Sequence, residues 1–220
     1  MNKKNIKFTI AIDGGSASGK TTGSKIIAKK FNFKLLSSGK LYRYLAYRII
    51  NSKKKYNKKF ILTISKKISL KKLNIKKLYS PEVTNLSSII AKKKFVRVAL
   101  RKFQIDFINK NRKVIIEGRD IASKIMPNAD LKIFFKCSVK EKARRRLQEF
   151  KKVNKKVKLK EVEKSLKIRD FSDKNRKESP LLFTKGAVLV DTTNLSKKQM
   201  EMKLVKLVKQ RIKKKLDGNI

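Results

Sequence analysis

Residues 14–21 read Gly14-Gly15-Ser16-Ala17-Ser18-Gly19-Lys20-Thr21 and fit the pattern G-x-x-x-x-G-K-[ST]. An apolar run, Phe8–Ile12, comes before them and predicts a buried strand, and Lys20–Phe31 predicts the helix that follows. In this setting glycines let the backbone wrap an anion, and the N–H groups at the helix start point toward it. The stretch therefore predicts a loop that binds the phosphates of a nucleotide.

Within this loop each residue type has an expected task. Lys20 would span the β- and γ-phosphates, and the hydroxyl of Thr21 would be a ligand of Mg²⁺. Ser16 and Ser18 act through their N–H groups or are simply turn residues. The predicted ATP-binding residues are Gly14, Gly15, Ser16, Ala17, Ser18, Gly19, Lys20, Thr21 and Thr22.

The rest of the chain alternates strand-like and helix-like segments, which predicts an α/β fold with a central parallel sheet between helical layers. Further strands are expected at Phe33–Leu36, Val114–Glu117, Leu131–Phe135 and Ala187–Asp191. Helices are expected at Gly39–Ile50, Ser138–Phe150 and Ser196–Leu216. We expect one domain over 1–220, with a small insertion at about 51–95 and a short lid at about 147–165.

Local signals refine this plan at several points. Phe60–Ser65 predicts a strand inside a lysine-rich insertion, and Lys151–Lys158 predicts a mobile loop. Ser80, followed by a proline and a glutamate, predicts a helix start. Ser196 with Gln199 three residues later predicts a capping box for the last helix.

Composition limits the classes of function. The chain has no histidine, so the commonest general base and zinc ligand are missing, and its one cysteine, Cys137, cannot form an internal disulfide. The single cysteine leads us to expect a cytoplasmic protein, and no apolar stretch is long enough for a transmembrane helix. We also expect a monomer. The net charge is +46, from 62 basic and 16 acidic residues. Its even spread along the chain favours compositional drift, and a polyanion-binding role is the alternative.

A phosphate loop by itself does not separate GTPases, motor ATPases and small-molecule kinases. The guanine-reading pattern N-K-x-D is absent from the sequence. Arginines far from the loop form a second set of cations, and arginine binds phosphate in a bidentate way. A kinase with a nucleotide acceptor needs such cations for its second anion.

At this point the sequence resembles the cytidylate kinase family over nearly its full length. The resemblance rests on five segments. They are Ile12-Asp13-Gly14 through Thr22, Leu36 through Arg43, Glu82-Val83 through Arg97, Glu117-Gly118-Arg119-Asp120-Ile121 with Pro127-Asn128-Ala129-Asp130, and Arg169-Asp170 through Asp173, Arg176 and Pro180-Leu181. The chain departs from the family at Gly15, where proline is common, and at Ser37, where aspartate is usual.

The resemblance implies transfer of the γ-phosphoryl group of ATP to CMP or dCMP. It makes Lys20, Arg119 and Arg176 the catalytic residues. It implies that the acceptor phosphate is bound by Arg43, Arg119 and Arg176, and that cytosine is read by Ser88, Arg97 and Asp120. Ser38 would line the acceptor site, and Asp173 and Arg169 would contact ribose and phosphate.

Geometry gives independent support to some of these roles. Arg169, Asp173 and Arg176 lie at i, i+4 and i+7, so one helix would present all three on one face; a surface ion pair is the alternative. Ser88 and Arg97 are nine residues apart and would lie on opposite faces of a straight helix. They converge only if the helix breaks near Lys92–Lys94, and plain helix-surface positions are the alternative.

Several other readings stay open. Asp120 could be a helix cap, Arg43 an exposed cation, and Arg144, Arg145 and Arg146 either a solvated face or contacts to donor phosphates. A kinase for UMP, AMP, shikimate or dephospho-coenzyme A would share the loop. A basic RNA- or ribosome-associated protein is the alternative outside enzymes, and we do not expect nucleic acid as a partner.

Overall fold

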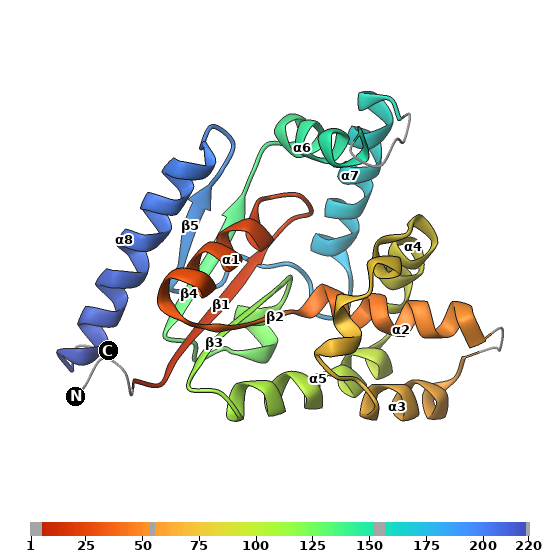
Figure 1. The fold of residues 1–220 in the computed structure, drawn as a ribbon. Helices are drawn as coiled ribbons and strands as arrows, with labels where there is room; N and C mark the ends of the chain where they lie inside the picture. The colour runs from red at the N-terminus through yellow and green to blue at the C-terminus, as the bar shows by residue number, and fades with distance from the viewer. Residues whose placement is uncertain (1–5, 53–55, 152–156, 219–220) are drawn as a thin grey trace. The chain divides into compact units, whose positions relative to one another are not determined.

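The strand before the phosphate loop, β1 (Phe8–Gly14), lies at the centre of a five-stranded sheet. A computed structural model describes residues 6–52, 56–151 and 157–218 of the chain (Figure 1). The strand order is β2-β3-β1-β4-β5, and β1 pairs in parallel with both β3 and β4, as β4 does with β5. The other strands are β2 (Lys34–Ser37), β3 (Lys113–Gly118), β4 (Leu131–Lys136) and β5 (Ala187–Asp191).

The chain divides into two compact units. The sheet unit comprises Met1–Leu35 and Arg112–Ile220, and the helical unit comprises Leu36–Asn111. The sheet unit holds the helices α1 (Lys20–Phe31), η3 (Ile121–Ile125), α6 (Val139–Lys151), α7 (Leu159–Asn175) and α8 (Lys197–Leu216). The helical unit holds α2 (Ser38–Ser52), α3 (Lys58–Lys66), η1 (Lys71–Asn74), η2 (Lys76–Tyr79), α4 (Pro81–Ile90) and α5 (Lys94–Asn109).

One face of the sheet is covered by α1 and α8, which lie side by side (Figure 1). The alternate β1 residues Phe8, Ile10 and Ile12 point into this layer and are fully buried. From α8 the predicted apolar stripe packs against them, with Met200, Leu204, Val208, Ile212 and Leu216 all in the same cluster. The expected α/β architecture, with a central parallel sheet and flanking helices, is confirmed.

The capping signals are confirmed as well. The Ser196 hydroxyl accepts from the Gln199 N–H while the Gln199 side chain accepts from the Ser196 N–H, so α8 begins with the predicted capping box. Ser80 accepts from the Val83 N–H and starts α4. α1 and β5 have the predicted bounds, and the other predicted helices and strands of the sheet differ by one or two residues.

The strand predicted at Phe60–Ser65 is wrong, because these residues form part of the helix α3. The Asn57 side chain caps that helix by accepting from the Phe60 N–H at 2.9 Å. Ile61 and Ile64 are buried three residues apart, which is a helical spacing. A short apolar run fits both periods, and here the cap and the packing of α3 against α5 select the helix.

The smaller predicted segments fall as follows. The insertion expected at 51–95 lies within the helical unit. The lid expected at 147–165 spans the end of α6 and the start of α7, which pack together through Ala143, Val162 and Leu166. The loop predicted at Lys151–Lys158 falls mostly on 152–156, outside the described residues. Among the described helices, none is both long and apolar enough to cross a membrane.

Candidate active site

The loop after β1 has a backbone that only small residues permit. Gly14 has φ 149°, and a Cβ atom there would lie 2.3 Å from the carbonyl oxygen of Phe135 on β4. Gly19 has φ 87° at the N-cap of α1, and Ala17 between them has φ 54°. These left-handed residues wrap the loop tightly before α1 begins, as an anion-binding loop requires. Thr22, which follows on α1, is exposed.

Lys20 lies back across this loop. Its Nζ donates to the carbonyl oxygen of Gly15 at 2.6 Å, and only 7% of the residue is exposed. Burial, together with the nearby charge of Arg119, holds the pKa of the Lys20 ammonium well below its usual value. Burial and the charge of Arg119 thus destabilise the charged form of Lys20, and a bound phosphate would stabilise it. This arrangement suits the binding of an anion.

The Thr21 hydroxyl lies beside a carboxylate. It donates to the two oxygens of Glu117 at 2.9 and 3.0 Å, and Glu117 is buried at the end of β3. Mg²⁺ in nucleotide sites takes one or two protein oxygens, and waters and substrate phosphates complete its shell. A hydroxyl and a buried carboxylate fit that requirement. No cluster of three His, Cys, Asp or Glu suited to a metal occurs in the described part of the chain.

Sequence reasoning gave Glu117 no role of its own. The only signal in the sequence was an acidic residue at the end of an apolar strand. The pairing of β1 with β3 is what shows that this residue, Glu117, lies near the phosphate loop. That register sets Ile12 opposite Glu117, which brings the carboxylate to the start of the loop.

Asp13, the last residue before the glycines, is a second buried carboxylate. It accepts from the N–H groups of Ile121 and Ala122 at 2.9 and 2.7 Å, and so holds the first turn of η3 against β1. Burial raises the pKa of Asp13 from 3.8 to about 6, although both N–H groups oppose the rise. Through this contact Asp13 positions the segment that carries Arg119 and Asp120.

Arg119 connects the loop to α7. Its Nη2 donates to the Ser16 hydroxyl at 3.0 Å, and its Nε donates to Asp173 at 2.7 Å. Burial alone would raise the pKa of the Asp173 carboxyl, but Arg119 outweighs it, with help from Arg176 and Arg169, and the pKa is lowered. Three predicted residues from distant parts of the sequence, Ser16, Arg119 and Asp173, thus meet at the loop.

Arg176 also joins this group, but not from the helix as predicted. α7 ends at Asn175, and Arg176 has extended backbone angles, φ −68° and ψ 139°. Its side chain turns back, with Nη1 3.3 Å from Asp173 and Nε donating to the Ser179 carbonyl at 2.7 Å. The helix ends there because the Asp173 carbonyl accepts from the Leu181 N–H at 2.8 Å instead of continuing the helical ladder.

Asp120 is 5% exposed and stands before η3. The Asp120 side chain makes no capping hydrogen bond to η3, so the helix-cap alternative is wrong. Its charge lies near enough to Asp13 to help raise the pKa of that carboxyl. Asp120 is therefore a buried carboxylate that does not cap η3, and its part in reading cytosine stays a prediction.

Of the three arginines on α6, one reaches the loop region. Arg145 donates to the hydroxyl and carbonyl of Thr192 at 3.1 and 2.6 Å, and Thr192 in turn donates to the Ser18 carbonyl at 3.0 Å. The buried Ser18 hydroxyl has no hydrogen-bond partner among the described residues. Arg144 pairs with Glu141 and is 65% exposed, which supports the solvated-face alternative for it. Arg146 pairs with Glu149 and lies over the Phe150 ring.

In the helical unit, Ser38 and Arg43 are both held by neighbours. The buried hydroxyl of Ser38 accepts from Gln104 Nε2 at 2.9 Å. Arg43 donates to the Leu78 carbonyl at 3.0 Å and to the Thr84 hydroxyl at 2.6 Å. The alternative of an exposed helix cation does not apply to Arg43, because these contacts fix its guanidinium.

The helix does break near Lys92–Lys94, which is the condition for Ser88 and Arg97 to converge. α4 ends at Ile90 and α5 begins at Lys94, and Lys93 between them is extended, with φ −86° and ψ 121°. The buried Arg97 uses this corner, because its Nη1 donates to the Ala91 carbonyl at 2.8 Å. Ser88 donates to the Asn85 carbonyl of its own helix at 2.7 Å. Their task as cytosine readers stays a prediction.

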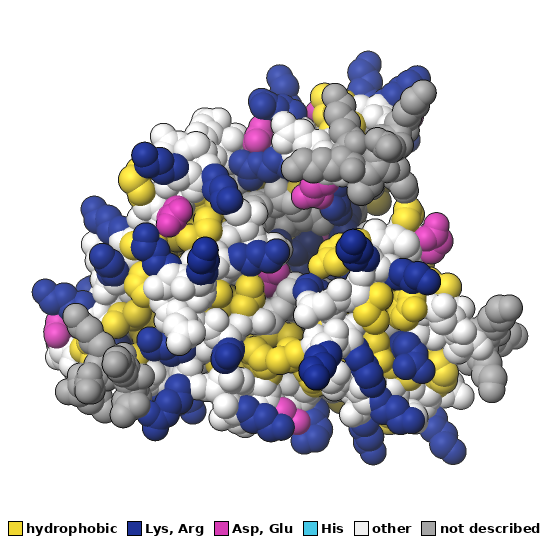
Figure 2. Space-filling model, in the orientation of Figure 1, with side chains coloured by type: hydrophobic (Ala, Val, Ile, Leu, Met, Phe, Trp, Pro, Cys, Tyr) yellow, Lys and Arg dark blue, Asp and Glu magenta, His cyan; other side chains and the backbone are white. Residues whose placement is uncertain are grey.

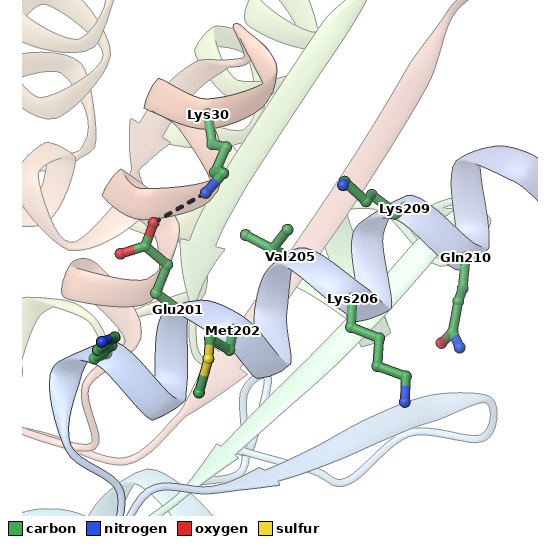
Figure 3. Close-up of a pocket in the computed structure, with 8 residues that line it drawn as sticks. Lys30, Glu201, Met202, Val205, Lys206, Lys209 and Gln210 are labelled. Carbon is green, nitrogen blue, oxygen red and sulfur yellow. Dashed lines mark hydrogen bonds and ion pairs between the residues drawn. The ribbon is translucent and has the colours of Figure 1, made fainter.

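Many basic side chains also lie on the surface outside these groups (Figure 2). Figure 2 shows Lys and Arg scattered over the visible face rather than gathered into one patch. An open groove lies between α1 and α8, with the exposed Lys30–Glu201 pair and Met202 at its wall (Figure 3). It shares no residue with the phosphate loop. The even spread agrees with compositional drift, and the exclusion of nucleic acid stays a prediction.

Comparisons with known proteins agree with this geometry. The profile of the cytidylate kinase family matches residues 10–210. A cytidylate kinase of Mycoplasmoides gallisepticum is 33% identical over 220 residues, covering 96% of this chain and 98% of the relative. One from Rickettsia felis is 35% identical over 206 residues, covering 93% of each.

Solved structures show the same fold at low identity. A shikimate kinase from Bacteroides thetaiotaomicron superposes with a TM-score of 0.51 at 14% identity, covering 92% of this chain and 97% of that one. An uncharacterised protein from Eubacterium ventriosum gives 0.52 at 13%, with 93% and 98% covered. The fold is thus that of the small P-loop kinases. Together with the family profile and the identity to curated relatives over most of its length, this shows that the chain belongs to the cytidylate kinase family.

Proposed function

We propose that the protein transfers the γ-phosphoryl group of ATP to CMP or dCMP, giving ADP and CDP or dCDP. The observation that carries the proposal is the contact of Arg119 with both Ser16 of the phosphate loop and Asp173 of α7. A phosphate loop alone serves many reactions. A second set of arginines tied to it serves a reaction that joins two phosphates.

The chemistry needs little from the protein beyond charge and position. An oxygen of the acceptor phosphate attacks the γ-phosphorus, the bond to the β–γ bridging oxygen breaks, and ADP leaves. The second pKa of a phosphate monoester is about 6, so the acceptor is already largely dianionic at neutral pH. No general base is required, which agrees with a chain that has no histidine.

The main barrier is repulsion between the two phosphates. We propose that Lys20 neutralises the donor phosphates, because its Nζ lies on the loop at Gly15. Arg119 and Arg176 would neutralise the acceptor and the transferred group, since both are held beside Asp173 with side chains largely buried. Preorganised cations in a partly desolvated place lower the barrier without having to rearrange during the reaction.

Mg²⁺ is the expected metal, and Thr21 with Glu117 would hold it. When bound, it would supply charge neutralisation to the β- and γ-phosphates. In the helical unit, Ser38, Arg43, Ser88 and Arg97 are proposed to bind the acceptor nucleotide, and Arg97 is supported by its burial at the α4–α5 corner.

The direct test is release of ADP in a coupled assay with ATP, Mg²⁺ and each nucleoside monophosphate in turn. We expect CMP and dCMP to exceed UMP by at least about tenfold in kcat/KM, and AMP and GMP to be inactive because of their size. Faster phosphorylation of UMP or AMP than of CMP would refute the cytidylate assignment and leave a broader kinase assignment standing.

A further inference from the structure

Asp170 on α7 contacts the phosphate loop directly. The N–H of Ser16 donates to its Oδ1 at 3.2 Å, and Nζ of Lys142, on α6, lies 2.6 Å from its Oδ2. Only 14% of the Asp170 side chain and 9% of the Lys142 side chain are exposed. Sequence reasoning assigned no role to either residue.

Both groups lie directly against Gly15 of the loop. A Cβ atom added to Gly15 would be 3.0 Å from Asp170 Oδ1 and 3.0 Å from Lys142 Nζ. Loop N–H groups of this kind are the donors that nucleotide phosphates use. The Asp170 carboxylate accepts from one of these N–H groups and pairs with the Lys142 ammonium through its other oxygen. These are the partners expected of a phosphate oxygen.

We propose that Asp170 is a placeholder for a donor phosphate: its carboxylate occupies an anion position of the loop, and ATP must displace it and take over Lys142. The inference rests on the proposed function in one respect, that this loop binds ATP. Phosphate and carboxylate oxygens repel each other and cannot share these partners. The exchange leaves Lys142 paired before and after ATP binds, so no buried ammonium is left without a counter-charge.

Two consequences follow for binding. Asp170 opposes the anion, so its removal strengthens binding, whereas Lys142 attracts the anion, so its removal weakens binding. A purely structural ion pair predicts something else, because loss of either partner would damage the same local structure and weaken binding in both cases.

The experiment is isothermal titration calorimetry of inorganic tripolyphosphate, and separately of ATP with Mg²⁺, against the full-length protein. For Asp170→Asn we expect the Kd for tripolyphosphate to fall at least fivefold, and for Lys142→Gln to rise at least fivefold. Glu161→Gln and Lys140→Gln are the matched controls, because they make the same charge changes at exposed positions of α7 and α6. Each control should stay within twofold of the wild type.

An Asp170→Asn protein that binds tripolyphosphate no more tightly than Glu161→Gln overturns the proposal. If Asp170→Asn does not fold, Lys142→Met is compared with Lys142→Met/Asp170→Asn, in which no buried charge lacks a partner. The double variant should bind more tightly than the single one, and equal or weaker binding is the contrary result.

The same series separates the two proposals. A wild type that binds both probes but phosphorylates no monophosphate disproves the proposed function and leaves the placeholder standing. A wild type that phosphorylates CMP, with an unchanged Kd in Asp170→Asn, disproves the placeholder alone.

Discussion

Asp13 offers a quantitative test of how the loop is held. Its carboxylate is 2% exposed and accepts two N–H groups from the start of η3, at 2.9 and 2.7 Å. Burial raises its pKa from 3.8 to about 6. Replacement by asparagine keeps the size and removes the titration, so the two proteins should differ in how their stability depends on pH.

The magnitude follows from the two pKa values of Asp13. One pKa unit corresponds to about 1.36 kcal/mol, so the rise to about 6 amounts to about 3 kcal/mol. The folded protein holds the proton more tightly than the unfolded chain does. This contribution to stability is therefore fully present below pH 3.8 and is lost as the pH rises through about 6. Between about pH 5 and 8 the loss is on the order of 1 kcal/mol.

The assay is urea unfolding of the wild type and Asp13→Asn at several pH values from about 5 to 8, at about 0.5 M salt to screen the high net charge. Asparagine leaves one N–H of η3 poorly paired, which lowers the free energy of unfolding by about 1–3 kcal/mol at every pH. Relative to the variant, the free energy of unfolding of the wild type should fall by about 1 kcal/mol across this range. The exposed Asp217→Asn shows the effect of removing an ordinary carboxylate. A difference between wild type and Asp13→Asn that does not change with pH would refute the reasoning.

Three further substitutions test the roles of single residues. Lys20→Met should keep the fold, checked by circular dichroism, and lower kcat by about 10²–10³, because the donor phosphates lose their buried cation; near-normal turnover would contradict this. Glu117→Gln should raise the Mg²⁺ concentration for half-maximal activity by about tenfold, as the carboxylate beside Thr21 is lost; an unchanged Mg²⁺ titration would exclude this metal site. Asp120→Ala should lower the CMP/UMP ratio of kcat/KM by about tenfold, mainly through lost CMP activity; a constant ratio would remove Asp120 from base recognition.

The sequence predicted the parts of the fold whose signals are local. The loop at Gly14–Thr21 depends on glycines and on its neighbours in the chain, and the capping box at Ser196 depends on residues three positions apart. All of these interactions are short in sequence, so composition and spacing determine them.

Where local signals were ambiguous, the prediction was wrong. Phe60–Ser65 is apolar enough for a strand, yet Asn57 and the packing against α5 make it helical. Arg176 follows Asp173 at a helical spacing, yet α7 ends one residue before it. In each case the local sequence permits two conformations, helix or strand for Phe60–Ser65 and helix or extended chain for Arg176. Contacts with other parts of the chain select the one that forms.

By itself, then, the sequence determined that this chain has a phosphate loop on a parallel sheet, together with a second set of arginines. Only the tertiary structure decided which charges face one another. Glu117 meets Thr21 from 96 positions away because β3 pairs with β1, and Asp170 meets Ser16 from 154 positions away because α7 reaches the loop. Such pairings depend on strand register and helix packing, and electrostatic attraction acts over distance in space rather than along the chain.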